Sequence, residues 1–118
     1  MRFTLLLFAL AHLLKLASFT NTRFKAYISK AQARILIRTD DGQRARLFMF
    51  DKGRFTSVAG NQKNFDAALI WKDAATGFTT MISKKPDASF NAAAEGKLRV
   101  EGMGVYAQWF EDGLKLIL

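Results

Sequence analysis

The chain has 118 residues, of which half are hydrophobic and eleven are Phe, and it contains no Cys. This length and apolar content predict one folded domain over residues 1–118 and argue against a disordered tail. The lack of Cys excludes disulfides and thiolate chemistry, and the single His excludes a cluster of imidazole metal ligands.

The formal net charge of +8 comes from the first half of the chain. Residues 1–54 hold eleven basic and three acidic residues, whereas residues 55–118 hold seven of each. A basic half joined to a neutral half indicates an anionic surface as partner, either a membrane or nucleic acid. We expect basic residues near the N-terminus to contact the membrane, namely Arg2, Lys15, Arg23, Lys25 and Lys30.

Residues 1–18 predict an amphipathic helix with a wide apolar side. The uninterrupted apolar run covers only residues 5–11, shorter than the roughly 20 residues that a membrane span needs. The interruptions by His12 and Lys15 also argue against a secretory signal. On a helical wheel the polar residues fall in one arc of roughly 120°, and leucines fill the rest; these polar residues are Thr4, His12, Lys15 and Ser18. Such a helix could lie in the core, in a dimer interface, on a membrane, or over a lipid cavity, or could be a cleaved signal.

Between residues 20 and 82, turn residues and alternating apolar residues predict a second helix, four strands and a third helix. A break at residues 20–22 precedes a second predicted helix over residues 23–32, so that residues 1–32 form an N-terminal helical part. Residues 33–118 then supply the sheet and its covering helices. Two turn signals, at residues 40–42 and 51–53, separate three predicted strands over residues 33–38, 44–50 and 54–58. A polar loop at residues 61–64 leads to a fourth strand over residues 65–71 and a helix over residues 74–82.

The segment 86–104 combines a short helix, a strand and two glycine turns. Pro86 suits the first turn of a helix, and Gly96 can adopt the left-handed conformation that ends it. Residues 97–101 alternate charged and aliphatic side chains, which predicts a fifth strand with one buried face. A final apolar tail follows Gly102 and Gly104.

The run Gly-Lys-Leu-Arg-Val-Glu-Gly at residues 96–102, with Phe90 six residues ahead, resembles a motif of sterol-carrier-type lipid-transfer domains. The resemblance covers residues 33–114. It implies an α+β fold, with a five-stranded, mostly antiparallel sheet and helices packed on one face. It also implies a tunnel between sheet and helices that holds an acyl chain or a sterol. The chain departs from the family in its tail, which is short for the family's C-terminal helix, and in its more apolar first helix.

Large apolar side chains on the predicted strands and helices are our candidates for the lining of such a cavity. Each of them could equally belong to an ordinary core. They are Phe48, Phe50, Phe55, Trp71, Phe78, Met81, Phe90, Met103, Trp109 and Phe110.

Motifs for catalysis are missing from the sequence. It has no Gly-x-Ser-x-Gly elbow. Glu111 and Asp112 are adjacent, so on a helix they would point about 100° apart and would not form an acid–base pair. We therefore expect a non-catalytic protein without a metal or cofactor.

These observations favour a hypothesis of lipid binding or transfer. The ligand would be a fatty-acyl, isoprenoid or sterol-like lipid, and the basic N-terminal half would contact an anionic membrane. We expect a cytoplasmic protein that can associate peripherally with membranes. One alternative is a ligand-free homodimeric interaction protein. Another is an RNA-binding module, because Arg44 and Arg46 share a strand face with Phe48 and Phe50.

Overall fold

The computed structural model describes residues 2–81 and 88–117, apart from the side chains of residues 2, 78, 81 and 88–90. Residue Pro86, predicted to begin a helix, therefore lies outside the described residues, as does the end of the helix predicted over residues 74–82. Two helices begin the chain, α1 (Arg2–Thr20) and α2 (Thr22–Ile28). The remaining elements follow in the order β1 (Gln32–Thr39), β2 (Ala45–Asp51), β3 (Arg54–Ala59), β4 (Ala67–Trp71), α3 (Ala74–Met81), α4 (Ala88–Ala94), β5 (Leu98–Gly102) and α5 (Gly104–Leu114).

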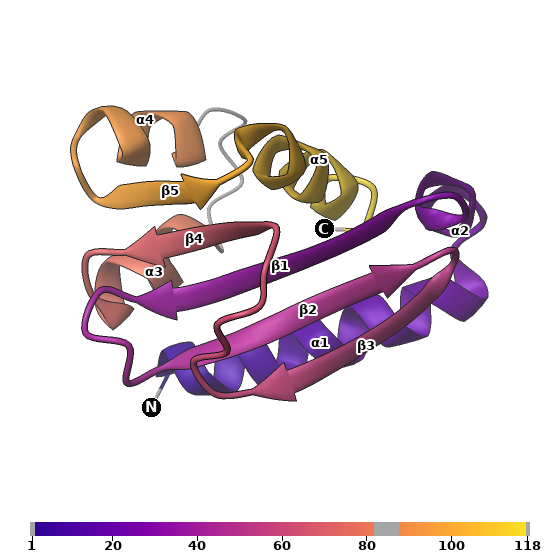
Figure 1. Ribbon diagram of the computed structural model, residues 1–118, viewed down its shortest axis with the longest axis horizontal. Coiled ribbons are helices and arrows are strands. Elements are labelled where there is room, and N and C mark those ends of the chain that lie inside the picture. Colours follow the sequence, from indigo (N-terminus) through magenta and orange to yellow (C-terminus); the bar gives the residue numbers. More distant parts are fainter. Residues whose placement is uncertain (1, 82–87, 118) are drawn as a thin grey trace.

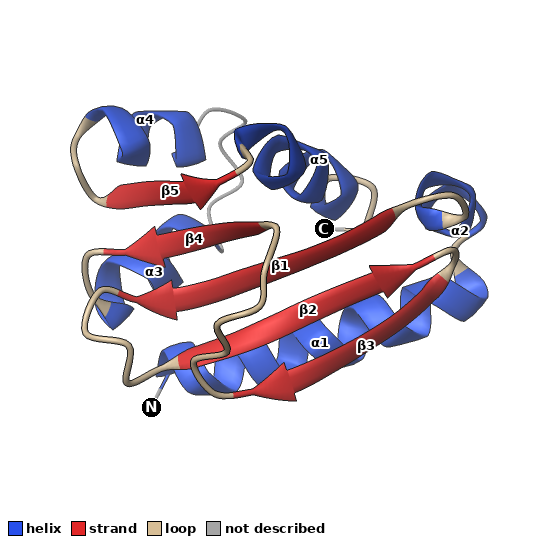
Figure 2. Ribbon diagram, viewed as in Figure 1, coloured by secondary structure: helices blue, strands red, loops and turns tan. Residues whose placement is uncertain are grey.

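The five strands form one mixed sheet in the order β3-β2-β1-β4-β5 (Figure 2). The β1–β2, β2–β3 and β4–β5 pairs are antiparallel, and β1–β4 is parallel. The predicted α+β class and the mostly antiparallel five-stranded sheet are thus confirmed. The parallel pair arises because the chain does not make a tight turn after β3. Instead, it crosses β2 and β1 before it enters β4 (Figure 1).

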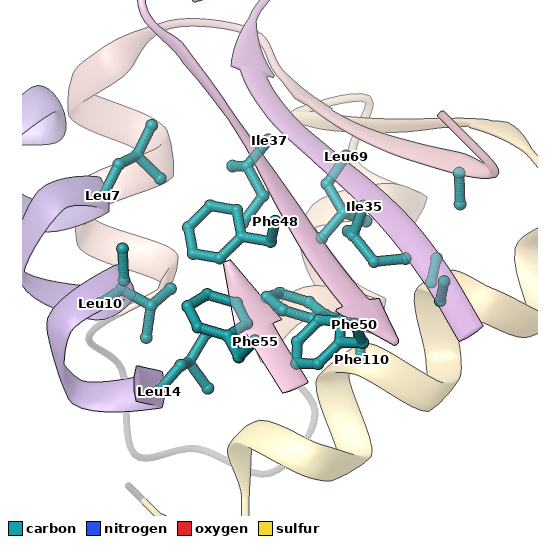
Figure 3. Close-up of a cluster of buried hydrophobic side chains, with 14 of the residues drawn as sticks. Leu7, Leu10, Leu14, Ile35, Ile37, Phe48, Phe50, Phe55, Leu69 and Phe110 are labelled. Atoms are coloured by element: carbon teal, nitrogen blue, oxygen red, sulfur yellow. The ribbon is translucent and has the colours of Figure 1, made fainter. Parts of the chain in front are cut away.

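One face of the sheet carries the main hydrophobic core, which α1 and α5 cover (Figure 3). Alternation along β2 directs Phe48 and Phe50 to this face, opposite Ile35 on β1 and Phe55 on β3. Helix α1 contributes one stripe at helical spacing, and α5 contributes Ala107 and Phe110. The buried α1 stripe consists of Phe3, Leu7, Leu10, Ala11, Leu14 and Ala17.

The opposite face of the sheet has a smaller core. Leu36, Leu47 and Ile70 are buried there, and Phe65 packs against them from the segment that connects β3 to β4. In Figure 1 this segment runs across the sheet on the side away from α1. The sheet is therefore apolar on both faces at its centre, with helices on one side and a crossing segment on the other.

The polar arc predicted for the first helix is right for Thr4, His12 and Lys15, which are exposed, and wrong for Ser18. Ser18 is buried, and its hydroxyl donates to the Lys15 carbonyl oxygen at 2.6 Å. The predicted apolar side of the helix is only partly buried. Leu7, Leu10 and Leu14 pack on the sheet, whereas other leucines of that side, such as Leu5 and Leu16, face solvent. The helix is continuous through His12 and Lys15, because both residues extend away from the buried stripe.

The estimate that the first helix is too short to span a membrane is also wrong. Over Phe3–Thr20, α1 is long and apolar enough to cross a membrane by length and composition. It is the single helix of this kind among the residues that the structure describes. Its buried stripe belongs to the main core, and core helices of soluble proteins pass the same test.

Other boundaries differ where local patterns compete with tertiary contacts. Helix α2 ends at Ile28, four residues earlier than predicted, because Gln32 already pairs with Asp51 in the sheet. Val100 on β5 is 40% exposed although the alternation predicted a buried face, since β5 lies at the sheet edge. The predicted tail is instead the eleven-residue helix α5, whose Phe110 anchors it to the core.

We expect Gly102→Ala to lower the free energy of unfolding by about 2–4 kcal/mol. Gly102 has φ of +80°, and a Cβ there would overlap the Asp66 carbonyl oxygen, which accepts a hydrogen bond from the Met103 amide at 2.9 Å. Gly96→Ala is the matched control. Gly96 has φ of +76° but no atom within 4 Å of an added Cβ, so it should cost only about 1–2 kcal/mol of conformational strain. Urea denaturation of both variants measures the difference, and equal losses would contradict the proposed backbone clash.

Candidate functional site

Five of the candidate lining residues lie in the main core. Phe48, Phe50, Phe55, Trp71 and Phe110 are all buried. Ring centroids are 5.0 Å apart for Phe50 and Phe55, and 5.7 Å apart for Phe48 and Phe110, which are ordinary aromatic packing distances. Figure 3 shows these rings between β2, β3, α1 and α5. In this conformation the four Phe rings fill space between the layers, and a ligand would have to part them.

Trp71 differs from these rings because its indole N–H has no acceptor. The residue is 1% exposed, and its Nε1 is the one buried side-chain nitrogen or oxygen without a hydrogen-bond partner in the described part of the chain. A buried donor left unpaired costs about 1–3 kcal/mol. Trp71 lies on β4 and contacts the backbone of α3 at Gly77, where an added Cβ would be 2.9 Å from its indole. The candidate side chains Phe78, Met81 and Phe90 belong to α3 and α4, and they lie outside the described residues.

The candidate residues Met103 and Trp109 belong to the N-cap and the middle of α5. Met103 is 55% exposed, and Trp109 is half-buried. The Trp109 ring stacks on Tyr27 at 5.4 Å, and the Tyr27 hydroxyl donates to the Trp109 carbonyl oxygen at 2.7 Å. Burial, together with the nearby Asp112 carboxylate, raises the pKa of Tyr27 above its ordinary value. Trp109 thus packs at the rim of the main core, whereas Met103 is the exposed N-cap residue of α5.

Helix α1 exposes several large apolar side chains on the side that faces away from the sheet. Leu5 is 65% exposed and Phe19 is 66% exposed, although both belong to a helix whose other side is fully packed. We use "outer α1 face" for the exposed apolar residues Leu5, Phe8, Leu13, Leu16 and Phe19. Exposed apolar side chains that gather on one side of a helix mark interaction sites more often than isolated exposed residues do.

Basic residues accompany the outer α1 face. Lys15 lies on the same helix, where its ammonium is 5.5 Å from the centre of the Phe19 ring and donates to the Phe55 carbonyl oxygen at 3.0 Å. Arg23, Lys25 and Lys30 are exposed on and just after α2, which follows α1 directly. The Arg2 side chain lies outside the described residues. Membrane contact by these five residues stays a prediction.

A groove of about 290 Å³ runs between α1 and the edge strand β3. Phe8, His12 and Lys15 line it from the helix, and Arg46 lines it from β2. The Arg46 guanidinium donates to the Ser57 hydroxyl at 2.8 Å and lies 5.6 Å from the centre of the Phe8 ring. The sequence pattern pointed to Arg46 only through the RNA-binding alternative and to His12 only as a polar residue of the first helix. One feature of the sequence could have indicated the groove: the alternation along the strand puts Arg46 on the same sheet face as Phe48.

The arrangement of Phe48 and Phe50 removes the basis for the RNA-binding alternative. Stacking on RNA bases needs exposed rings on an open sheet face. Both rings are buried beneath the helices, and Phe50 packs edge-on against Trp109 with centroids 5.0 Å apart.

A second hollow of about 540 Å³ lies at one end of the sheet, and two of its three carboxylates, Asp41 and Asp73, have structural roles. Asp41 accepts from the Thr39 hydroxyl at 2.6 Å and from the Gln43 amide at 3.0 Å, and these bonds lower the pKa of Asp41 below its ordinary value. Asp73 accepts from the Thr76 amide at 2.7 Å at the start of α3, which lowers the pKa of Asp73. Both groups are held ionised by turn and cap bonds, so neither is arranged as a proton donor. The described residues hold no group of three His, Asp or Glu placed to bind a metal ion.

Comparison with solved structures identifies the fold. No protein-family model matches the chain, and no curated protein matches it. A structure of UbiJ-SCP2, a ubiquinone synthesis protein, superposes with a TM-score of 0.75 at 14% identity, and the match covers 97% of this chain and 96% of the other. Sterol carrier protein 2 from Yarrowia lipolytica, in its apo form, gives a TM-score of 0.60 at 19% identity over 92% of this chain and 88% of the other.

The same fold also occurs within a larger enzyme. The alkylsulfatase Pisa1 from Pseudomonas sp. gives a TM-score of 0.55 at 11% identity, where the match covers 78% of this chain and 14% of that one. These likenesses show that the chain has the α+β fold of the sterol carrier proteins. The recognition based on residues 96–102 is therefore confirmed at the level of the fold.

We expect Phe110→Ala to lower the free energy of unfolding by about 3–5 kcal/mol, because the ring contacts Phe48 and Phe50 in a packed core. Val105→Ala on the same helix is the control, since Val105 is 70% exposed and should change stability by less than about 0.5 kcal/mol. Urea midpoints of the two variants check this. A small loss at Phe110 would mean that the ring faces space that other side chains or a ligand can fill.

Proposed function

We propose that this chain is a non-catalytic lipid-binding protein that works at the surface of anionic membranes. Its ligand would be a fatty-acyl, isoprenoid or sterol-like lipid. The observation that carries the proposal is the outer α1 face, which presents five large apolar side chains to solvent on a helix that is anchored in the core by its opposite side.

The outer α1 face fits a helix that lies in the plane of a membrane interface. Transfer of one Leu or Phe side chain from water to an apolar phase is worth about 1.5–3 kcal/mol when burial is complete. Lys and Arg add about 1 kcal/mol each near anionic lipid. With Lys15 on α1 and Arg23 and Lys25 on the helix that follows, insertion of the apolar side chains would bring basic groups toward lipid phosphates.

The unpaired Trp71 N–H supports a ligand that reaches the core between β4, α3 and α4. A hydroxyl or carbonyl oxygen on the ligand would accept from Nε1 and remove the cost of a buried donor. Trp71 would contact the ligand there, and Phe78, Met81 and Phe90, which belong to α3 and α4, stay predicted lining residues.

The other candidate rings would contact a lipid tail only after they separate. Each aromatic pair is worth about 0.5–1.5 kcal/mol beyond its buried area. A tail gains about 0.8 kcal/mol per buried methylene, or about 8 kcal/mol for ten. Entry of a long chain between Phe48, Phe50, Phe55 and Phe110, with Trp109 at the rim and Met103 exposed at the N-cap of α5, is therefore energetically accessible.

The comparisons support this choice by analogy. Two structures of the same fold are described as sterol carrier protein 2 and as a ubiquinone synthesis protein. Because a fold alone does not define a function, we extend the analogy to one role: an accessory protein in the cytoplasm that presents a polyisoprenoid intermediate to a membrane-associated biosynthetic enzyme.

Native mass spectrometry of the protein purified from cells tests ligand binding. We expect the native protein to carry extra mass that matches a lipid found in the organic extract and that is lost after extraction. The lipid should stay bound through purification because its apolar tail is buried in the protein. Repeated preparations with a clean apo mass would contradict ligand binding.

Vesicle binding of the double variant Leu16→Ser/Phe19→Ser tests the role of the outer α1 face. Both residues are exposed, so we expect stability to change little and affinity for phosphatidylglycerol-containing vesicles to fall about ten-fold or more, since two apolar side chains no longer insert. Val58→Ser on β3 is the control, because Val58 is also exposed and apolar but lies outside α1. If the double variant instead converts a dimer to a monomer and leaves vesicle binding intact, the outer α1 face is a homodimer interface and the membrane role is wrong.

A further inference from the structure

Arg46 occupies a position on the sheet where the pattern calls for an apolar residue. It lies on the face of β2 that carries Phe48 and Phe50, opposite Ile37 of β1. The side chain is half-buried, yet its described polar contact is one hydroxyl, that of Ser57 at 2.8 Å. A guanidinium has five N–H donors, so most of them are free to bind a ligand in the groove. A guanidinium that is partly withdrawn from water gains from charge-assisted hydrogen bonds to an anion.

The rest of the groove is also rich in donors. Lys15 uses one of its three donors on the Phe55 carbonyl oxygen, and the His12 ring lies beside Phe8 with centroids 4.5 Å apart. The groove lining includes no carboxylate, and none of the ion pairs among the described residues involves Lys15 or Arg46. Two cations therefore share a small groove without an anion.

We propose that the groove formed by Phe8, His12, Lys15 and Arg46 binds the phosphomonoester headgroup of a lipid whose tails lie along the outer α1 face. Phe8 belongs both to the groove and to the outer α1 face, so the two sites are continuous. This assignment rests on the proposed function, because it takes for granted that the outer α1 face meets lipid.

A phosphomonoester fits the chemistry of the groove better than a phosphodiester does. Its terminal oxygens can accept two parallel bonds from a guanidinium and a further bond from an ammonium. A phosphodiester presents fewer free oxygens and a single negative charge. The groove volume of about 290 Å³ suits a headgroup and not a long tail, which leaves the tail to the apolar side chains outside.

Co-sedimentation of the full chain with vesicles tests the site. One set contains phosphatidylcholine with phosphatidic acid, and the other contains phosphatidylcholine with phosphatidylglycerol at matched surface charge. We expect the wild type to bind phosphatidic acid vesicles about ten-fold more tightly, as charge-assisted hydrogen bonds would provide. Arg46→Gln and Lys15→Gln should each remove this preference and leave the melting temperature nearly unchanged.

Arg54→Gln is the matched control, since Arg54 is an exposed arginine on β3 outside the groove. The Arg54→Gln variant should bind both kinds of vesicle equally more weakly and should keep the preference for phosphatidic acid. If the wild type binds both vesicles equally, or if all three variants lose the same amount on both, the headgroup site is wrong while membrane binding stands. If the wild type binds neither vesicle, the proposed membrane role itself fails, and the headgroup site fails with it. Competition by glycerol 3-phosphate as tight as that of the vesicle lipid would assign the groove to a soluble phosphate ester and overturn the lipid assignment.

Discussion

The packing of Phe rings across one face of the sheet is the interaction on which the structure depends. Phe48 and Phe50 from β2, Phe55 from β3 and Phe110 from α5 contact one another between the layers. Helix α1 packs on these rings with Leu7, Leu10 and Leu14 facing the sheet (Figure 3), in a close-packed interior. The orientation of α1 then decides which of its leucines remain in solvent.

This division of α1 links the core to the proposed function. The helix is apolar nearly all round, but a single sheet face can bury only one stripe of it. The leucines and phenylalanines of the outer α1 face are exposed, and they lie next to a groove lined by Lys15 and Arg46. One helix therefore stabilises the domain with one side, and with the other it creates an amphipathic surface whose chemistry matches that of a lipid.

The strands could be predicted from residues 33–59 because alternation and turn residues act over short distances. The Asp-Gly turn after β1 and the Lys-Gly turn after β2 define the meander, with Lys52, Gly42 and Gly53 at positive φ. The parallel pairing of β1 with β4 could not be predicted, since it depends on the path of residues 60–66 across the sheet. The groove was missed for the same reason: His12 and Arg46 are far apart in sequence, and only the packing of α1 on β2 and β3 brings them together.

The sequence by itself determined the class of fold, the alternation that places Phe48 and Phe50 inside, and the surplus of apolar residues in the first helix, because all three follow from local periodicity and composition. The tertiary structure alone decided which side of that helix is buried, since two similarly apolar arcs compete and only shape complementarity with the sheet distinguishes them. It also decided that the last segment is a helix, through the contacts of Phe110. It placed the exposed arc beside Lys15 and Arg46, which form no ion pair among the described residues.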